Sequence, residues 1–142
     1  MDNIQADFEF EGYKIDNISF KLNPNFKGGA IGINLKFNIV PGISDDFKKG
    51  SLSITADINH TNDSSESNAL FSASVTMVGL FNNPSNASKE DFGRFLHLNG
   101  VATLMPFLRG AIADITRTAN IPPCVIPLIN VYKMTDTPLA EK

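Results

Sequence analysis

Histidine is the side chain that most often moves protons or binds a metal near neutral pH, and this chain has only two, His60 and His97. They lie far apart in the sequence, and neither stands in a motif with a partnering thiol or carboxylate. His97 lies among Phe95, Leu96 and Leu98 at helical spacing, which favours a structural role over a catalytic one. The histidines therefore give no indication of acid–base chemistry or of a metal site.

The other candidate residues also fit structural roles. Cys124 is the single cysteine and has no second thiol or histidine nearby, so it is expected to be a small core residue. Asp45 and Asp46 are adjacent in a polar loop, where neighbouring side chains point apart. Gly28 and Gly29 lack the strand-to-helix setting and the lysine of a phosphate-binding loop. We therefore expect no enzyme, no metal ion and no cofactor.

Length and composition limit the class of protein further. The chain has 142 residues, of which 42% are apolar, so a single domain over 1–142 can bury a core. The net charge is −3 and the twelve basic residues are scattered, so no nucleic-acid surface is expected. No apolar run reaches the roughly 18–20 residues of a membrane span. The acidic N-terminus is unlike a secretion signal, and one cysteine suits a reducing compartment, so we expect a cytoplasmic protein.

Four segments alternate between apolar and polar residues, as strands with one buried face do. They cover about 7–22, 31–39, 51–59 and 69–81. Gly12 shifts the phase of the first segment, which indicates a bulge, and Pro41-Gly42 is expected to end the second. Four such strands followed by helices predict an α+β fold with a four-stranded antiparallel sheet.

Two helices are expected after the strands. Ser88 stands three residues before an acid, which is typical of a helix N-cap, and it opens a short helix to about residue 98. A long helix over 99–119 follows, and prolines 122 and 123 prevent its continuation. Pro106 leaves two possibilities open: a kink in a helix that begins at Val101, or the first turn of a helix that begins near Met105. One apolar seam runs along the long helix at spacings of four and three: Val101, Met105, Leu108, Ile112, Ile115 and Ala119.

The apolar inventory is large for one sheet and one long helix, because the chain holds eleven phenylalanines and four methionines. A single helix cannot easily cover the sheet and also bury a strict four–three seam, which is a pattern of helix packing between subunits. Either the core is unusually aromatic, or apolar surface is kept for self-association and partner binding.

The long helix and the segment after it resemble the SecB family of protein-export chaperones. The family's Leu-Phe-Pro-Tyr-Ala-Arg is matched by Leu-Met-Pro-Phe-Leu-Arg at 104–109, and its later Phe-Pro by Ile121-Pro122. Its Pro-Val-Asn-Phe is matched loosely by Leu-Ile-Asn-Val at 128–131. In the strands, Ile-Ser-Phe at 18–20 is the same as in the family, and Gly-Leu-Phe at 79–81 stands where the family has Gly-Ile-Phe.

The resemblance implies a homotetramer, built as a dimer of dimers, in which long helices meet between four-stranded sheets. It also implies an ATP-independent holdase that binds unfolded preproteins in apolar grooves and delivers them to the SecA motor. We expect these residues to contact the unfolded client: Phe20, Leu22, Phe71, Phe107, Ile121 and Leu128. We expect these residues to form the oligomer interface: Val101, Met105, Leu108, Ile112 and Ile115.

The sequence departs from the family at the acids that help to dock the motor. Asn17, Lys21 and Ser74 stand at those positions, and the chain has only a short tail after Val131. We therefore expect client binding, but not strong binding to SecA. A chaperone dedicated to one client, such as the antitoxin of a toxin–antitoxin pair, is a close alternative. A non-catalytic oligomerisation module is a second alternative.

Overall fold

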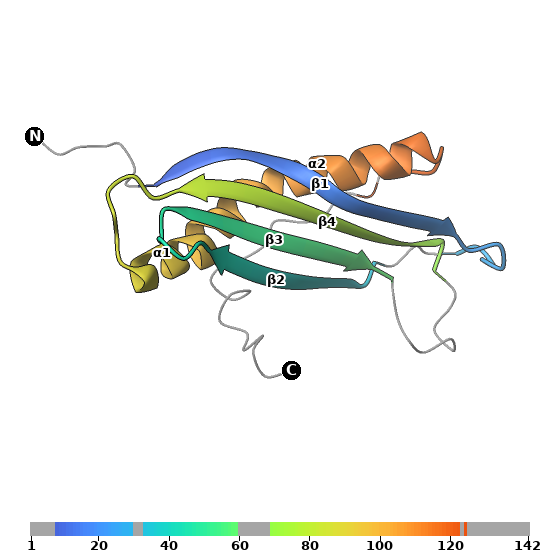
Figure 1. Ribbon diagram of the computed structural model, residues 1–142. Helices are drawn as coiled ribbons and strands as arrows, with labels where there is room; N and C mark the ends of the chain where they lie inside the picture. Colours follow the sequence, from blue (N-terminus) through green and yellow to red (C-terminus); the bar gives the residue numbers. More distant parts are fainter. Residues whose placement is uncertain (1–7, 30–32, 60–68, 123, 125–142) are drawn as a thin grey trace, which may run out of the picture.

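The computed structural model describes residues 8–29, 33–59, 69–122 and 124, and it places all of the helices on one face of a four-stranded sheet (Figure 1). The predicted α+β class is confirmed. The elements in chain order are β1 (Glu9–Leu22), β2 (Leu35–Ile43), β3 (Lys49–Ile58), β4 (Phe71–Asn82), α1 (Lys89–Phe95), the π-helical segment η2 (Leu96–Gly100) and α2 (Val101–Thr118).

The strands are antiparallel and lie in the order β1-β4-β3-β2, so β1 and β2 form the two edges. The register of β1 against β4 shifts twice, between Phe10 and Gly12 and again between Ile15 and Asn17. The first shift confirms the predicted bulge, and Gly12 has a φ of 142° that other residues rarely adopt. The bulges divide β1 into short regular stretches.

β2 is the strand that differs most from the sequence-based prediction. It begins at Leu35 and continues through Pro41 and Gly42 to Ile43, so the prediction that Pro41-Gly42 ends the strand is wrong. β2 pairs only with β3, and a proline can be accommodated on an edge strand because its missing N–H can face away from the neighbour. Residues 31 and 32 of the predicted strand lie outside the described residues.

The two faces of the sheet differ sharply in polarity. Alternate residues of β3 and β4, including Leu52, Ile54, Val75 and Met77, point toward the helices and are fully buried. We call this the inner face. The outer face carries hydroxyl groups instead, and Thr55 and Thr76 are linked across the strands by a hydrogen bond of 2.9 Å. One face is therefore built to be covered, and the other meets water.

The helical segments follow one another without a break from Lys89 to Thr118, crossing the sheet from β2 toward β1 (Figure 1). Ser88 caps α1 as predicted, since its side chain accepts a hydrogen bond of 3.1 Å from the amide of Asp91. The buried residues recur every four positions. Because a regular α-helix has about 3.6 residues per turn, a repeat of four moves gradually around the helix. The wider turn of η2 offsets part of this drift, and these residues are all buried: Phe92, Leu96, Gly100, Leu104, Leu108, Ile112 and Thr116.

Pro106 lies inside α2, six residues into a helix that begins at Val101. The alternative in which the helix starts near Met105 is therefore wrong. Pro106 and Ala102 both lie on the exposed side of α2, so the carbonyl that loses its helical partner can bind water.

The helix ends before the prolines. Asn120 adopts a left-handed conformation with a φ of 64°, and its amide donates to the carbonyl of Arg117 over 3.0 Å. The amide of Ile121 donates to the carbonyl of Thr116 over 3.3 Å, which completes a Schellman motif. Asparagine tolerates this conformation better than most residues, so Asn120 stops the helix two residues before Pro122.

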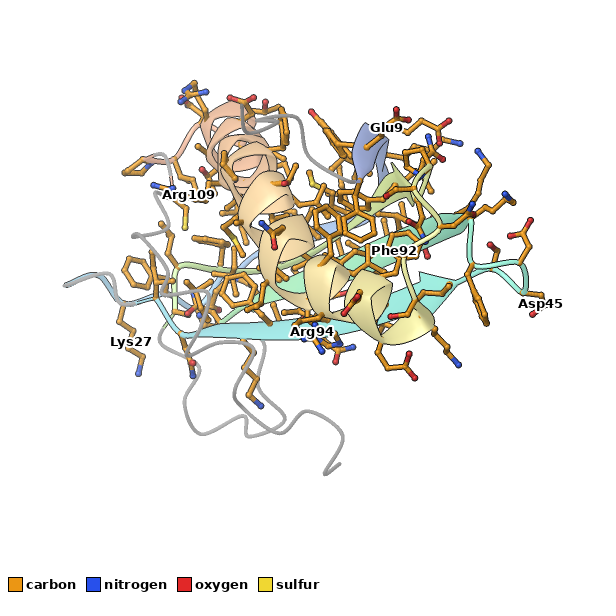
Figure 2. All side chains as sticks on the ribbon, turned by 90° about the vertical axis from the view of Figure 1, so that its left-hand side faces the viewer. Glu9, Lys27, Asp45, Phe92, Arg94 and Arg109 are labelled. Atoms are coloured by element: carbon orange, nitrogen blue, oxygen red, sulfur yellow. The ribbon has the colours of Figure 1, made fainter. Side chains whose placement is uncertain are left out.

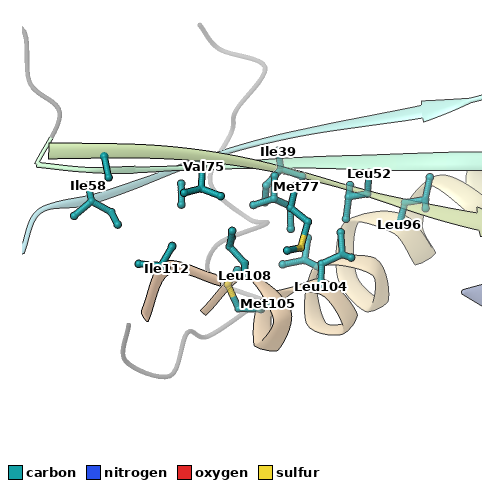
Figure 3. Close-up of a cluster of buried hydrophobic side chains, with 14 of the residues drawn as sticks. Ile39, Leu52, Ile58, Val75, Met77, Leu96, Leu104, Met105, Leu108 and Ile112 are labelled. Atoms are coloured by element: carbon teal, nitrogen blue, oxygen red, sulfur yellow. The ribbon is translucent and has the colours of Figure 1, made fainter. Parts of the chain in front are cut away.

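Most of the predicted interface seam belongs to the core of one chain. Val101, Met105, Leu108 and Ile112 are buried in the core of the chain. Figure 3 shows Met105, Leu108 and Ile112 in the cluster between α2 and the sheet. The prediction of all four as oligomer-interface residues is therefore wrong, because a side chain already covered within one chain has no surface left for a partner. The fifth residue, Ile115, is half-buried, and its place in an interface stays a prediction.

Close packing between α2 and the sheet depends on glycine at Gly79. A Cβ atom there would lie 2.8 Å from both methyl carbons of Leu104. We predict that Gly79→Ala lowers the free energy of unfolding by about 1–3 kcal/mol through overpacking. Gly110→Ala is the matched control, because nothing lies within 4 Å of its Cβ position on exposed helix. This control should gain about 0.5–1 kcal/mol from helix propensity, and urea unfolding measures both. Equal effects of the two substitutions would contradict the packing.

Candidate functional site

The inner face of β1 is the part of the sheet that the helices leave uncovered. Ile18 is 52% exposed and Leu22 is 46% exposed, although both point to the same side as the buried core residues of β4. Phe10 and Tyr13 belong to the same face and are also exposed. An apolar row of this length on an edge strand is a typical mark of a binding surface.

Phe107 of α2 extends this surface across to the helix. Its side chain is 42% exposed, and its ring centroid lies 4.6 Å from that of Tyr13 and 6.1 Å from that of Phe10. Phe10 in turn packs on buried Phe81 with a centroid distance of 5.3 Å, so the cluster is anchored to the core. We call the exposed residues Phe10, Tyr13, Ile18, Leu22 and Phe107 the β1 surface.

A hollow of about 330 Å³ opens beside the β1 surface, near the end of α2. It is lined by Phe20, Ile115 and Ala119, with Asp114 and Thr118 as its polar members. Its lining is therefore mainly apolar, which suits an apolar side chain of a bound polypeptide better than a charged group.

The predicted client-contact residues divide into three groups. Phe20, Leu22 and Phe107 lie on the β1 surface or in its hollow. Phe71 is only 3% exposed and stacks beneath Phe20 with ring centroids 5.4 Å apart, so the prediction that Phe71 contacts a client directly is wrong for this conformation. It supports the floor of the hollow instead.

The last two predicted client contacts follow α2. Ile121 is half-buried and packs against the core directly after the Schellman motif. Leu128 lies outside the described residues. The contact of these two side chains with a client stays a prediction.

The three positions of the expected motor-docking acids come together on the outer face. Ser74 pairs with Ser19, and Asn17 and Lys21 are the next outward-facing residues on either side of Ser19 in β1. Diagonal neighbours of this kind lie about 7–8 Å apart in a sheet. The structure thus gathers Asn17, Lys21 and Ser74 into one patch on the side away from the β1 surface, where Asp57 of β3 pairs with Ser74.

Asp46 and Cys124, two of the residues considered for catalysis, make hydrogen bonds that hold a turn and a helix end in place. Asp46 accepts hydrogen bonds from Ser44 Oγ at 2.7 Å and from the amide of Lys48 at 3.0 Å, which lower the pKa of this turn carboxylate. Cys124 is buried, which raises the pKa of its thiol. Its amide donates to Thr116 Oγ1 over 2.8 Å, which ties residue 124 to α2.

Neither a metal site nor a membrane-spanning helix is found in the described part of the chain. His97 is half-buried on η2, and His60 lies outside the described residues. Within the described ranges, no three His, Cys, Asp or Glu side chains are grouped so that they could hold a metal ion. In the same part of the chain, no helix has both the length and the apolar character needed to cross a membrane.

The sequence-based prediction did not include Phe10, Tyr13 or Ile18 among the client contacts, and it named Ile115 only as an interface residue. All four lie in apolar patterns, but a pattern does not tell which strand will be an edge and stay uncovered. The signal that could have drawn attention to β1 is the bulge at Gly12, because bulges are enriched at sheet edges and functional sites.

Comparisons with known proteins agree with the architecture. The family model described as SecB, preprotein translocase subunit SecB, matches residues 7–141. The chain is similar in structure to the Rv1957 SecB-like chaperone of Mycobacterium tuberculosis, solved in complex with a ChAD peptide from the Rv1956 HigA1 antitoxin. The TM-score is 0.69 and the identity 13%, covering 87% of this chain and 91% of that one.

A relative found by sequence is the uncharacterized protein MJ0357 of Methanocaldococcus jannaschii. It is 49% identical over 41 residues, which is 29% of this chain. The matched segment spans only 26% of the length of MJ0357. This relative therefore supports a local likeness and says nothing about activity.

Proposed function

The chain belongs to the SecB family of chaperones, which is not an enzyme family, and we propose that it is an ATP-independent holdase that binds unfolded polypeptides in the cytoplasm. The observation that carries this proposal is the β1 surface, where five large apolar side chains stay exposed in a folded domain. A surface of aromatic and aliphatic groups with no fixed polar partner suits clients of varied sequence, since apolar contacts are not directional.

The proposal assigns two parts of this region to the client. The exposed ring face of Phe107, held by Tyr13, offers aromatic contact area. The hollow lined by Phe20 and Ile115 can take one apolar side chain, and Leu22 lies beside it on the same face of β1. Ile121 and Leu128 stay candidates for the continuation of the path beyond α2.

We also propose that the chain assembles into a homotetramer, a dimer of dimers. β1 lies at an edge of the sheet, so one side of its backbone has no strand partner among the described residues. Such an edge next to exposed apolar side chains is a ready template for pairing with a second copy. Ile18 lies in the longest regular stretch of β1 and is not one of the two parts of the region assigned to the client above, so it is our first choice of interface residue.

Delivery to the SecA motor has weaker support than client binding. Asn17, Lys21 and Ser74 stand where the family has docking acids, and Lys21 would repel a basic partner. Asp57 beside Ser74 is the carboxylate that remains in this patch. The replacement of these acids favours a second candidate function, a chaperone dedicated to one client. The M. tuberculosis chaperone was solved with an antitoxin peptide, so an antitoxin is the first client class to test for this chain.

The holdase proposal predicts that the purified protein suppresses aggregation of an unfolded model client without nucleotide. Phe107→Ala and Leu22→Ala should weaken binding by about 1–2 kcal/mol each, because each removes partly exposed apolar area. Phe47→Ala is the matched control, since Phe47 is an equally exposed phenylalanine at the tip of the β2–β3 hairpin. Light scattering measures suppression, and thermal unfolding checks that the variants stay folded. Full suppression by both variants, or none by the wild type, would refute the assignment.

The assembly proposal predicts that Ile18→Asp shifts the tetramer to smaller species in native mass spectrometry. A carboxylate at this position would be buried without a partner in a symmetric contact. Val40→Asp is the control, because Val40 is also 52% exposed but lies on the outer face of β2. A wild-type protein that is monomeric at micromolar concentration would refute the assembly proposal. The holdase proposal would then still be tested by the aggregation assay alone.

The third prediction concerns the outer face. We expect weak or undetectable binding to a SecA C-terminal segment at physiological salt, measured by titration calorimetry. The triple substitution Asn17→Asp, Lys21→Glu and Ser74→Glu should strengthen binding, and added salt should remove the gain by screening. Tight, salt-insensitive binding by the wild type would show that docking uses another surface and would restore export delivery as the first reading.

A further inference from the structure

A second hollow, of about 300 Å³, lies at the start of β1, outside the β1 surface. Its apolar walls are Phe8, Phe95 and Leu98, and Asp91, Arg94 and Asn99 stand around it. We call it the Phe8 pocket. Figure 2 looks at this end of the molecule, where Glu9 marks the start of β1 and where Phe92 and Arg94 mark α1.

The aromatic walls of the Phe8 pocket are fixed by the core. The ring of Phe8 stacks on Phe92 at 5.2 Å, with an angle of only 4° between the planes, and on Phe95 at 4.4 Å. Phe95 meets Phe81 edge to face at 5.6 Å. Phe92 and Phe81 are fully buried, so the two rings that line the pocket rest on immobile neighbours. A pre-formed wall costs little ordering entropy when a ligand binds.

The polar side of the pocket carries no net charge. Arg94 donates to the carboxylate of Asp91 over 2.9 Å, so the two charges neutralise each other at the rim. Asn99 adds an amide, which can both donate and accept a hydrogen bond. A phosphate or a free carboxylate would find no uncompensated cation here, whereas an uncharged ring with a nearby peptide group finds partners for both.

The position of the pocket links it to the β1 surface. Phe8 and Phe10 are two residues apart and both contact the aromatic cluster on the helix side. Tyr13 lies five residues beyond Phe8, and the bulge at Gly12 takes up one of them, so the separation is about 13–17 Å. A polypeptide that lies along the β1 surface at Tyr13 and Phe107 therefore reaches the Phe8 pocket with roughly five further residues.

We propose that the Phe8 pocket receives an aromatic side chain of an extended polypeptide client. This proposal deepens the holdase function and rests on it. It makes the pocket an anchor that selects for an aromatic residue about five positions from a second apolar residue bound beside Phe107. The client class is therefore narrower than any unfolded chain.

The chain contains no tryptophan and two tyrosines, so a tryptophan in a peptide can be followed without background from the protein. The probe is a polar peptide with one tryptophan five residues from a leucine, and its pair has alanine in place of tryptophan. We expect the tryptophan emission to shift to shorter wavelength as wild-type protein is added. The alanine peptide, followed by calorimetry, should bind about tenfold more weakly.

Two variants localise the binding. Leu98→Asp places a charge in the pocket wall and should reduce affinity for the tryptophan peptide about tenfold. Ala87→Leu narrows the same hollow without a charge and should also weaken binding. Ala102→Asp is the matched control, because Ala102 is exposed on the same helical run and does not line the pocket. Circular dichroism confirms that each variant is folded.

Three outcomes would overturn the proposal. Equal affinity of wild type and Leu98→Asp for the tryptophan peptide would place the ring elsewhere. Binding of N-acetyltryptophanamide as tight as that of the peptide would show a pocket for a free aromatic molecule. A wild-type protein that suppresses aggregation but binds neither peptide would refute the pocket and leave the holdase function intact. Failure in both assays would instead refute the holdase function itself.

Discussion

One helical run has to cover a sheet of four strands, and this constraint decides which apolar side chains remain exposed. A helix with its side chains is about 10 Å wide, whereas four strands about 4.8 Å apart present a face roughly 15–20 Å wide. The run from α1 to α2 crosses the sheet from β2 toward β1 and packs mainly on β3 and β4. Such a path buries the central strands and leaves the inner face of β1 partly open.

The closeness of this packing determines where function can reside. Gly50, Gly79 and Gly100 bring backbone so near to Phe92, Leu104 and Leu52 that an added methyl group would meet them at 3.0 Å or less. Most of the apolar seam of α2 is buried in this contact and has no surface left for a partner. Partners can instead contact the β1 surface, which includes Phe107 of α2, and the hollows that helix residues line near the two ends of β1.

Much of the fold could be predicted from the sequence, because period-two alternation and the Ser88 cap are local signals. β3 and β4 agree with their predicted ranges to within two residues, and the alternation correctly separates their buried and exposed faces. The edges were harder. From local sequence alone, Pro41 predicts the end of a strand. A proline fits inside β2 because β2 is an edge strand with a single neighbour.

The candidate site was predictable only in part, for the same reason. Phe20, Leu22 and Phe107 were found because their residue types match a family pattern. Phe71 and the seam residues belong to equally apolar patterns but lie under the helix. Burial depends on which strand the helix crosses and on how η2 rotates the residues that follow it. Neither can be predicted from local periodicity. A family resemblance predicts the type of residue at a position more reliably than it predicts whether that side chain is exposed.

The bulges of β1 also affect the tendency to aggregate, because this protein exposes an apolar edge strand to other proteins in the cell. Uninterrupted edge strands invite endless stacking of sheets into fibrils, and natural proteins interrupt them to avoid it. Here the longest regular stretch of β1 is Asn17–Leu22, and the opposite edge carries Pro41, which cannot donate a backbone hydrogen bond. A short contact can close between two molecules, but neither edge offers the long, flat ribbon that a growing fibril requires.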